Sequence, residues 1–166
     1  MKKTSNEKTL FLCQAALIAA MYVALTFLSS LFGLDKGVIQ VRFSEMLCVL
    51  PMIMNAAIPG VTVGCLISNV IFGGTLLDII FGTLATLIGA LGTYALRRIK
   101  WLAPLPAVLS NALIIPFVLA YGYGVEEAIW LMMLTVGAGE VISVGVLGLI
   151  LYFSLRKSAD RIFKLK

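Results

Sequence analysis

Three acidic side chains stand in stretches of sequence that are otherwise almost wholly apolar. The chain has eight aspartates and glutamates, and five of them lie in polar tails, in loops or at polar helix starts. Glu45 and Asp78 each open a long apolar stretch, whereas Glu140 lies inside one. An unpaired carboxylate at the centre of an apolar layer costs roughly 3 kcal/mol or more. These three positions therefore predict a binding site.

Two amides and one guanidinium accompany the carboxylates. Asn69 closes the apolar stretch before Asp78, Asn111 lies in the middle of another, and Arg42 precedes Glu45 by one helical turn. Carboxylate and amide oxygens accept hydrogen bonds from N–H groups, and charge strengthens these bonds. The predicted site therefore favours a ligand rich in N–H donors, including a cationic one. Its residues are Arg42, Glu45, Asn69, Asp78, Asn111 and Glu140.

Each of these residues also has a purely structural interpretation. Glu45 follows Ser44 at an expected helix start, where it could satisfy free amides and the helix dipole, and Asp78 has the same alternative. Arg42 and Glu45 could form a salt bridge three residues apart, and the two asparagines could join helices. Glu140 has no helix end to cap, so the structural alternative is weakest there.

Several kinds of chemistry are disfavoured by what the sequence lacks. The chain has no histidine, and Cys13, Cys48 and Cys65 lie in separate segments without metal-ligand or redox spacing. There is no GxxxxGK[ST] phosphate loop, so an ATP-driven role requires another subunit. We therefore expect no catalysis, no metal and no cofactor in this chain.

The composition places the site in a membrane protein. Apolar residues make up 61% of the 166 residues and charged residues only 13%, against about 25% charged in soluble domains. We predict an all-α, polytopic bundle of six transmembrane helices in one domain, residues 1–166, and a multi-pass protein of the cell membrane. Proline and glycine residues divide the long apolar stretch after Arg42 in two. The expected helices are Leu10 to Ser30, Phe43 to Asn55, Pro59 to Phe72, Leu76 to Arg98, Pro104 to Ala120 and Glu126 to Ser154.

The distribution of basic residues predicts the orientation, since lysine and arginine are enriched in cytoplasmic loops. With six helices and both termini in the cytoplasm, three basic clusters lie inside, and only Lys36 and Arg42 lie outside. A five-helix arrangement would place the middle cluster outside. The three clusters are Lys2, Lys3 and Lys8; Arg97, Arg98 and Lys100; and Arg156, Lys157, Arg161, Lys164 and Lys166.

Small residues recur every four positions in the first helix, at Ala16, Ala20 and Ala24. Such a stripe lies on one helix face and lets another helix approach closely. On spacing alone, packing within the same chain is the favoured interpretation, with a partner subunit as the alternative. Gly60 and Gly64 form a similar pair that we assign to internal packing.

Three segments resemble the QueT family, whose members transport queuosine precursors as substrate-binding S components of energy-coupling factor (ECF) transporters. The resemblance covers nearly the whole chain. Its most specific part is the run Asp78 to Leu87, and the other parts are Val41 to Glu45 and Gly64 to Asn69. S components share a fold but differ in ligand.

The resemblance implies a function and partners. The alanine stripe would dock on the transmembrane coupling (T) subunit, and two ATPase subunits on the cytoplasmic side would drive a toppling motion that carries the ligand inward. The ligand would be a 7-deazaguanine, whose ring N–H and amino groups a carboxylate can accept in parallel. Two alternatives stay open: an S component for another vitamin, and a standalone proton-coupled carrier in which Glu140 titrates.

Overall fold

The computed structural model describes residues 5–34 and 39–156, and every regular element in these ranges is helical. The predicted all-α class is confirmed. The α-helices are α1 (Ser5–Leu31), α2 (Ala57–Ile71), α3 (Thr83–Ala95), α4 (Leu105–Gly122), α5 (Ile129–Glu140) and α6 (Leu149–Arg156). A 3₁₀ helix, η1 (Phe43–Met52), and two π-helical segments, η2 (Asp78–Gly82) and η3 (Val141–Gly148), complete the chain.

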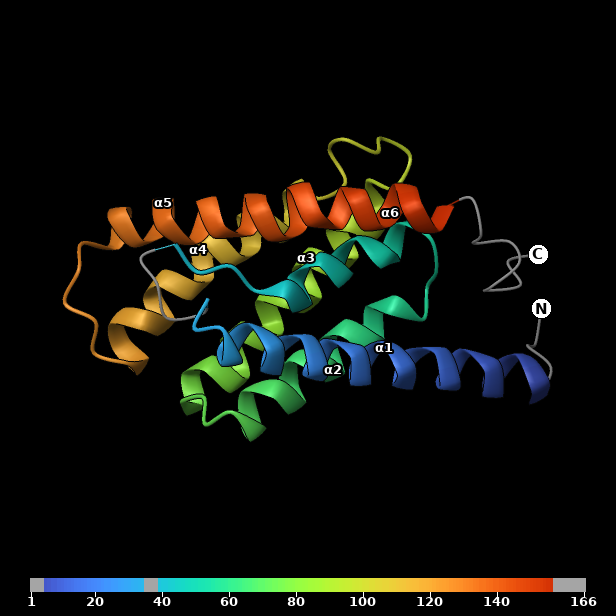
Figure 1. The fold of residues 1–166 in the computed structure, drawn as a ribbon, viewed down its shortest axis with the longest axis horizontal. Coiled ribbons are helices and arrows are strands. Elements are labelled where there is room, and N and C mark those ends of the chain that lie inside the picture. The colour runs from blue at the N-terminus through green and yellow to red at the C-terminus, as the bar shows by residue number, and fades with distance from the viewer. Residues whose placement is uncertain (1–4, 35–38, 157–166) are drawn as a thin grey trace.

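Two long helical rods run along the length of the molecule, as Figure 1 shows. One rod is α1, and the other is the continuous run of α5, η3 and α6 from Ile129 to Arg156. The first residues of α1 and the last residues of α6 lie at the same end of the molecule (Figure 1). The loop between α3 and α4 reaches this end too, because the Trp101 ring packs on Phe153 of α6 with centroids 5.6 Å apart.

Four helical units are long and apolar enough to cross a membrane: Ser5–Leu31, Asp78–Ala95, Leu105–Gly122 and Ile129–Arg156. The last has 28 residues and, at ~1.5 Å per residue, exceeds the ~30 Å hydrocarbon core. The two remaining apolar helices, η1 and α2, are shorter. The second predicted helix ends at Met52 rather than Asn55. Pro51 lies in this last turn and lacks the amide hydrogen that a continuing helix needs.

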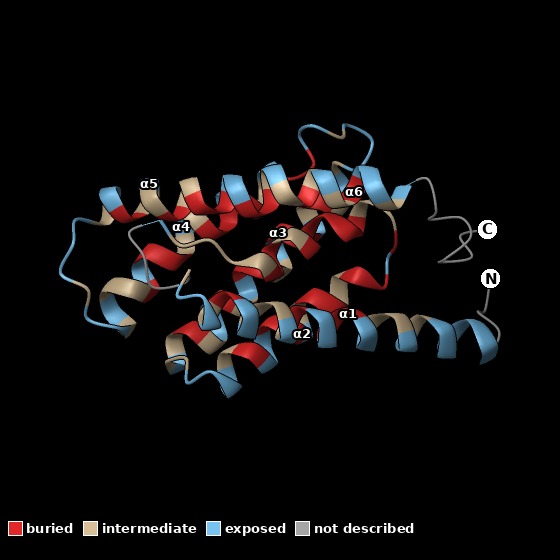
Figure 2. Ribbon diagram, in the orientation of Figure 1, coloured by how far each residue is buried: buried red, intermediate tan, exposed pale blue. Residues whose placement is uncertain are grey.

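The outward faces of the bundle are rich in large apolar side chains. Leu17 on α1, Leu134 on α5 and Ile150 on α6 are each at least 60% exposed, and Figure 2 shows exposed residues along the outer faces of both rods. Such surfaces are unfavourable in water and favourable against lipid tails. The fold therefore presents an apolar exterior around a smaller interior.

The interface between α1 and α2 depends on two glycines. A Cβ atom at Gly64 would lie 2.6 Å from the Tyr22 Cβ, and one at Gly60 would lie 2.9 Å from Ile18. The assignment of Gly60 and Gly64 to internal packing is confirmed. Glycine lets the two backbones approach closely, as small residues do between membrane helices.

The alanine stripe lies on a different face of α1. Ala16, Ala20 and Ala24 are all exposed, and they line a shallow apolar groove of about 650 Å³ together with Val63 and Ile67 of α2. The interpretation of this stripe as packing within the chain is therefore wrong for the described residues. The stripe is available to lipid or to another protein.

Candidate ligand-binding site

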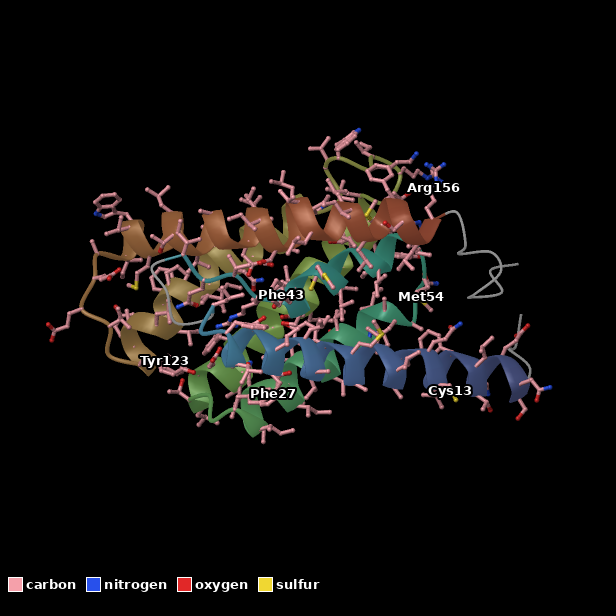
Figure 3. The ribbon with its side chains drawn as sticks, in the orientation of Figure 1. Cys13, Phe27, Phe43, Met54, Tyr123 and Arg156 are labelled. Carbon is pink, nitrogen blue, oxygen red and sulfur yellow. The ribbon has the colours of Figure 1, made fainter. Side chains whose placement is uncertain are left out.

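A cavity of about 370 Å³ opens at the end of the bundle away from Arg156. In Figure 3, Tyr123 and Arg156 mark these opposite ends. The cavity lies where α1, α2 and α4 end and where the chain enters η1. Its walls combine apolar side chains with polar groups that converge from different helices, including Ser29, Gln40, Arg42, Ser68, Asn69, Asp78 and Tyr123. Ligand pockets typically have this volume and this mixture.

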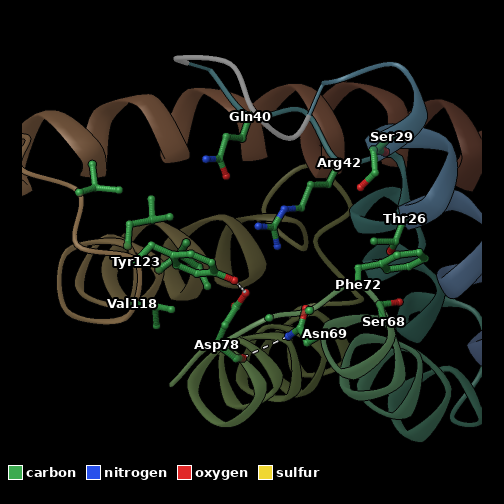
Figure 4. A pocket seen from close by; sticks show the side chains of 16 residues that line it. Thr26, Ser29, Gln40, Arg42, Ser68, Asn69, Phe72, Asp78, Val118 and Tyr123 are labelled. Atoms are coloured by element: carbon green, nitrogen blue, oxygen red, sulfur yellow. Dashed lines mark hydrogen bonds between the residues drawn. The ribbon is translucent and has the colours of Figure 1, made fainter. Parts of the chain in front are cut away.

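Asp78 supplies a carboxylate to the cavity wall at the start of η2. The Tyr123 hydroxyl donates a hydrogen bond of 2.7 Å to Asp78 Oδ2 and accepts one of 3.4 Å from the backbone amide of Thr75. Thr75 Oγ1 in turn accepts from the amide of Asp78 at 3.3 Å. The amide at this helix start is thus bonded by Thr75 and not by the Asp78 carboxylate, and Tyr123 bridges the two residues. These bonds fix the carboxylate at the cavity (Figure 4).

Tyr123 is well suited to hold this carboxylate. Burial, followed by its hydrogen bond with Asp78, raises the pKa of the Tyr123 phenol above its usual value. The phenol is therefore protonated throughout the physiological range and remains a donor. Tyr123 was not predicted as a site residue. Tyr123 stands between two glycines just after α4, and this turn-forming sequence was the feature that could have indicated it.

Asn69 joins the ends of α2 and η2 while lining the cavity. Its side-chain amide donates to the carbonyl oxygen of Asp78 at 3.1 Å and contacts Cys65 Sγ at 3.7 Å. The interhelical interpretation of Asn69 is confirmed by these contacts. Because its amide also faces the cavity beside Asp78 (Figure 4), a role in ligand binding stays a prediction.

Arg42 brings a positive charge into the cavity. Its side chain is half-buried and points into the space between Gln40 and Asn69 (Figure 4), while its backbone amide donates to Ser143 Oγ at 3.1 Å. Within residues 5–34 and 39–156, Arg42 forms no ion pair shorter than 4.0 Å. The predicted alternative of an Arg42–Glu45 salt bridge is therefore wrong.

The charges around Arg42 nevertheless stabilise its protonated form. Burial alone would lower the pKa of the Arg42 guanidinium, but the Asp78 and Glu45 carboxylates together with other negative groups raise it above its usual value. Arg42 thus remains a cation and a donor of several hydrogen bonds. It faces the carboxylates across space that a ligand can occupy.

Glu140 and Asn111 lie in a small chamber beside the main cavity. This chamber has a volume of about 10 Å³ and shares Gln40, Arg42 and Ile115 with the cavity wall. Glu140 is 7% exposed, and its Oε2 atom has no hydrogen-bond partner among the described residues. The structure thus brings Arg42, Asn111 and Glu140 together, as the sequence predicted for this part of the site.

Glu45 lies apart from both spaces. It is 2% exposed and does not line the cavity or the chamber. Tyr22 donates its hydroxyl to Glu45 Oε1, and Cys48 Sγ contacts Oε2 at 3.2 Å. The helix η1 has no side-chain cap, so Glu45 does not serve as one. Its place is a buried link between α1 and η1.

Ser68 is a further polar residue of the cavity that the sequence did not indicate. It is 1% exposed, and its hydroxyl lacks a hydrogen-bond partner in the part of the chain that the structure describes. A buried hydroxyl without a partner is unfavourable. A polar group of a ligand in the cavity would supply the missing bond.

Comparison with known proteins gives a consistent result. A family model described as QueT transporter matches residues 12–157. A protein from Lactococcus lactis subsp. cremoris (strain MG1363), named queuosine precursor transporter QueT, is 40% identical over 101 residues. This alignment covers 60% of the present chain and 57% of the relative. No solved structure matches the chain.

Proposed function

Because the chain belongs to the QueT transporter family, we propose that it is the S component of an ECF transporter and binds a queuosine precursor of the 7-deazaguanine type. The cavity of about 370 Å³ carries this proposal. It is large enough for a bicyclic base, and its wall contains both an acceptor, Asp78, and a cationic donor, Arg42. The name of the Lactococcus relative supports the ligand class.

The two polar sides of the cavity match the two kinds of group on a guanine-type edge. Asp78 accepts from the ring N–H and the exocyclic amino group, which point in the same direction on such an edge. Arg42 donates to the neighbouring ring carbonyl. Phe72, Val118 and Leu119 provide apolar surface for the ring faces.

The chain is a multi-pass membrane protein, and we assign it six membrane helices with both termini in the cytoplasm. The loop that carries Arg97 and Arg98 lies at the same end as Arg156, which is consistent with the enrichment of basic residues on the cytoplasmic side. The cavity lies at the other end. It therefore faces the extracellular side in this orientation.

The alanine stripe is the surface that we assign to the coupling subunit. Ala16, Ala20 and Ala24 are exposed along one face of α1, so a partner helix could approach this backbone closely. Energy would come from two ATPase subunits that bind the coupling subunit in the cytoplasm. The described residues include no phosphate loop that could replace them.

Ligand binding by the purified chain tests the proposal directly. We expect the protein in detergent to bind 7-deazaguanines in calorimetry and to melt at a higher temperature in their presence, while riboflavin, thiamine and biotin have no effect. Asp78→Asn should weaken deazaguanine binding by about 1–3 kcal/mol through loss of a charged acceptor. The matched control is Glu126→Gln, which changes an exposed acid outside the cavity.

Two outcomes would contradict this function. Stabilisation by one of the vitamins alone would assign the chain to another ligand class within the same transporter type. Uptake driven by a pH gradient into liposomes that contain only this chain would instead identify a standalone carrier. Deazaguanine uptake that requires the coupling subunit, both ATPases and ATP is the expected result.

A further inference from the structure

The small chamber beside the main cavity contains an incomplete polar site. Its walls are Gln40, Arg42, Asn111, Ile115, Val136 and Glu140. Its volume of about 10 Å³ is close to the space that a single water molecule needs. An ammonium group has a similar size, whereas a ring does not fit. The chamber can therefore receive only one small polar group.

Glu140 defines which group the chamber needs. The carboxylate is more than nine-tenths buried, and Oε2 has no partner among the described residues. Asn111 approaches the same carboxyl group from α4, and its amide oxygen offers a second acceptor. A buried carboxylate oxygen without a donor is strongly unfavourable. The chamber is thus built for a donor, and a charged donor satisfies it best.

We propose that the chamber binds the ammonium group of a ligand whose ring occupies the main cavity. This inference rests on the proposed function, and it names the substituent: an aminomethyl or similar short cationic arm. Gln40, Arg42 and Ile115 form walls of both spaces, so a short arm on the ring can pass from one space to the other. The protein therefore prefers cationic precursors to neutral ones.

The position of Arg42 is compatible with a second cation. Its guanidinium points into the main cavity, on the side of Asp78 and Asn69 (Figure 4). Asp78 and Asn69 line the main cavity together with Arg42, whereas Glu140 lines the chamber and not the main cavity. The Arg42 guanidinium therefore faces the ring-binding side (Figure 4), and the partnerless oxygen of Glu140 is left for the ammonium group. A nitrile in place of the ammonium group would place its acceptor nitrogen against the Glu140 carboxylate, which is also an acceptor.

Three deazaguanines that differ only in the 7-substituent test this assignment: aminomethyl, cyano and hydrogen. With the full-length protein in detergent, we expect the aminomethyl compound to bind about tenfold or more tightly than the cyano compound. Glu140→Gln should abolish this preference, so that the aminomethyl and cyano compounds bind the variant with affinities within about twofold of each other. Glu127→Gln, which changes an exposed acid near the start of α5, should retain the preference.

A second variant covers the case in which Glu140→Gln does not fold. Asn111→Leu removes the amide acceptor and fills the chamber while keeping Glu140 in place, so it should also reduce the preference. Equal binding of the aminomethyl and cyano compounds, or a preference that survives in the folded Glu140→Gln protein, would overturn the subsite alone. Failure of all three compounds to bind would overturn the proposed function together with the subsite.

Discussion

The absence of a side chain at Gly139 lets the backbone of Gln40, in the segment that lines the cavity, approach closely. A single methyl group at this position should therefore disturb the proposed ligand site without changing any polar side chain. A Cβ atom at this position would lie 2.0 Å from the carbonyl oxygen of Gln40 and 2.9 Å from its carbonyl carbon. Real Cβ contacts are essentially never shorter than 3.0 Å. Gly139→Ala must therefore push the backbone at Gln40 away by about 1 Å or shift the helix by as much.

The size of the effect follows from this displacement. Gln40 and Arg42 belong to the same short segment, and both line the cavity. Binding groups need to be held within about 0.5 Å of the productive geometry, so a shift of twice that size should weaken deazaguanine binding at least about tenfold, or ~1.4 kcal/mol. Overpacking should also destabilise the fold by about 1–3 kcal/mol, which the gain in helix propensity of up to ~1 kcal/mol only partly offsets.

Gly137→Ala is the matched control in the same helix. A Cβ atom there would meet the Ala112 Cβ at 3.5 Å, which is an ordinary contact. We expect this variant to melt at or above the wild-type temperature and to bind normally. Calorimetry and thermal melting in detergent measure both quantities. Wild-type binding by Gly139→Ala, or an equal loss in both variants, would refute the role of this close approach.

The remaining predictions concern the hydrogen bond between Tyr123 and Asp78 and the groove lined by the alanine stripe. Tyr123→Phe removes the donor to Asp78 and should weaken ligand binding by about 1 kcal/mol, less than a fully buried charged bond because Tyr123 is 46% exposed; Tyr121→Phe changes a phenol that does not line the cavity and should be neutral in calorimetry. Ala20→Trp should block co-purification with the coupling subunit and leave ligand binding intact, whereas Leu17→Trp, outside the groove, should not. Normal co-purification of Ala20→Trp would count against the docking surface.

The sequence predicted the helical class and the apolar character of the elements well because both follow from local composition. Long apolar runs predicted helices, and proline and glycine residues between positions 51 and 60 correctly predicted a break between η1 and α2. Polar residues inside such runs indicated Asp78, Asn69 and Glu140, which the structure places at the cavity or its chamber. These signals need no knowledge of which helices are neighbours.

The sequence could not show in the same way which face of each helix points into the bundle. A membrane helix can be apolar on its lipid face and on its packed face, so hydrophobic periodicity does not show which side points inward. Glu45 therefore looked equivalent to Asp78, although it is bonded by Tyr22 and Cys48 away from the cavity. The π-helical turns beginning at Asp78 and Val141 also change the register of the residues that follow.

The contacts of the three carboxylates support the proposed ligand, which has both donors and acceptors. Neutral donors satisfy Glu45 and one oxygen of Asp78, and neither carboxylate forms an ion pair within 4.0 Å of Arg42 among the described residues. Glu140 keeps an oxygen without a partner, and Arg42 keeps a guanidinium without a close carboxylate, among the residues for which the structure gives positions. If these two charges met directly, the site would be complete and a ligand would gain little by entering. Because they are held apart, a molecule that donates to Glu140 and accepts from Arg42 can form a charge-assisted bond with each of them.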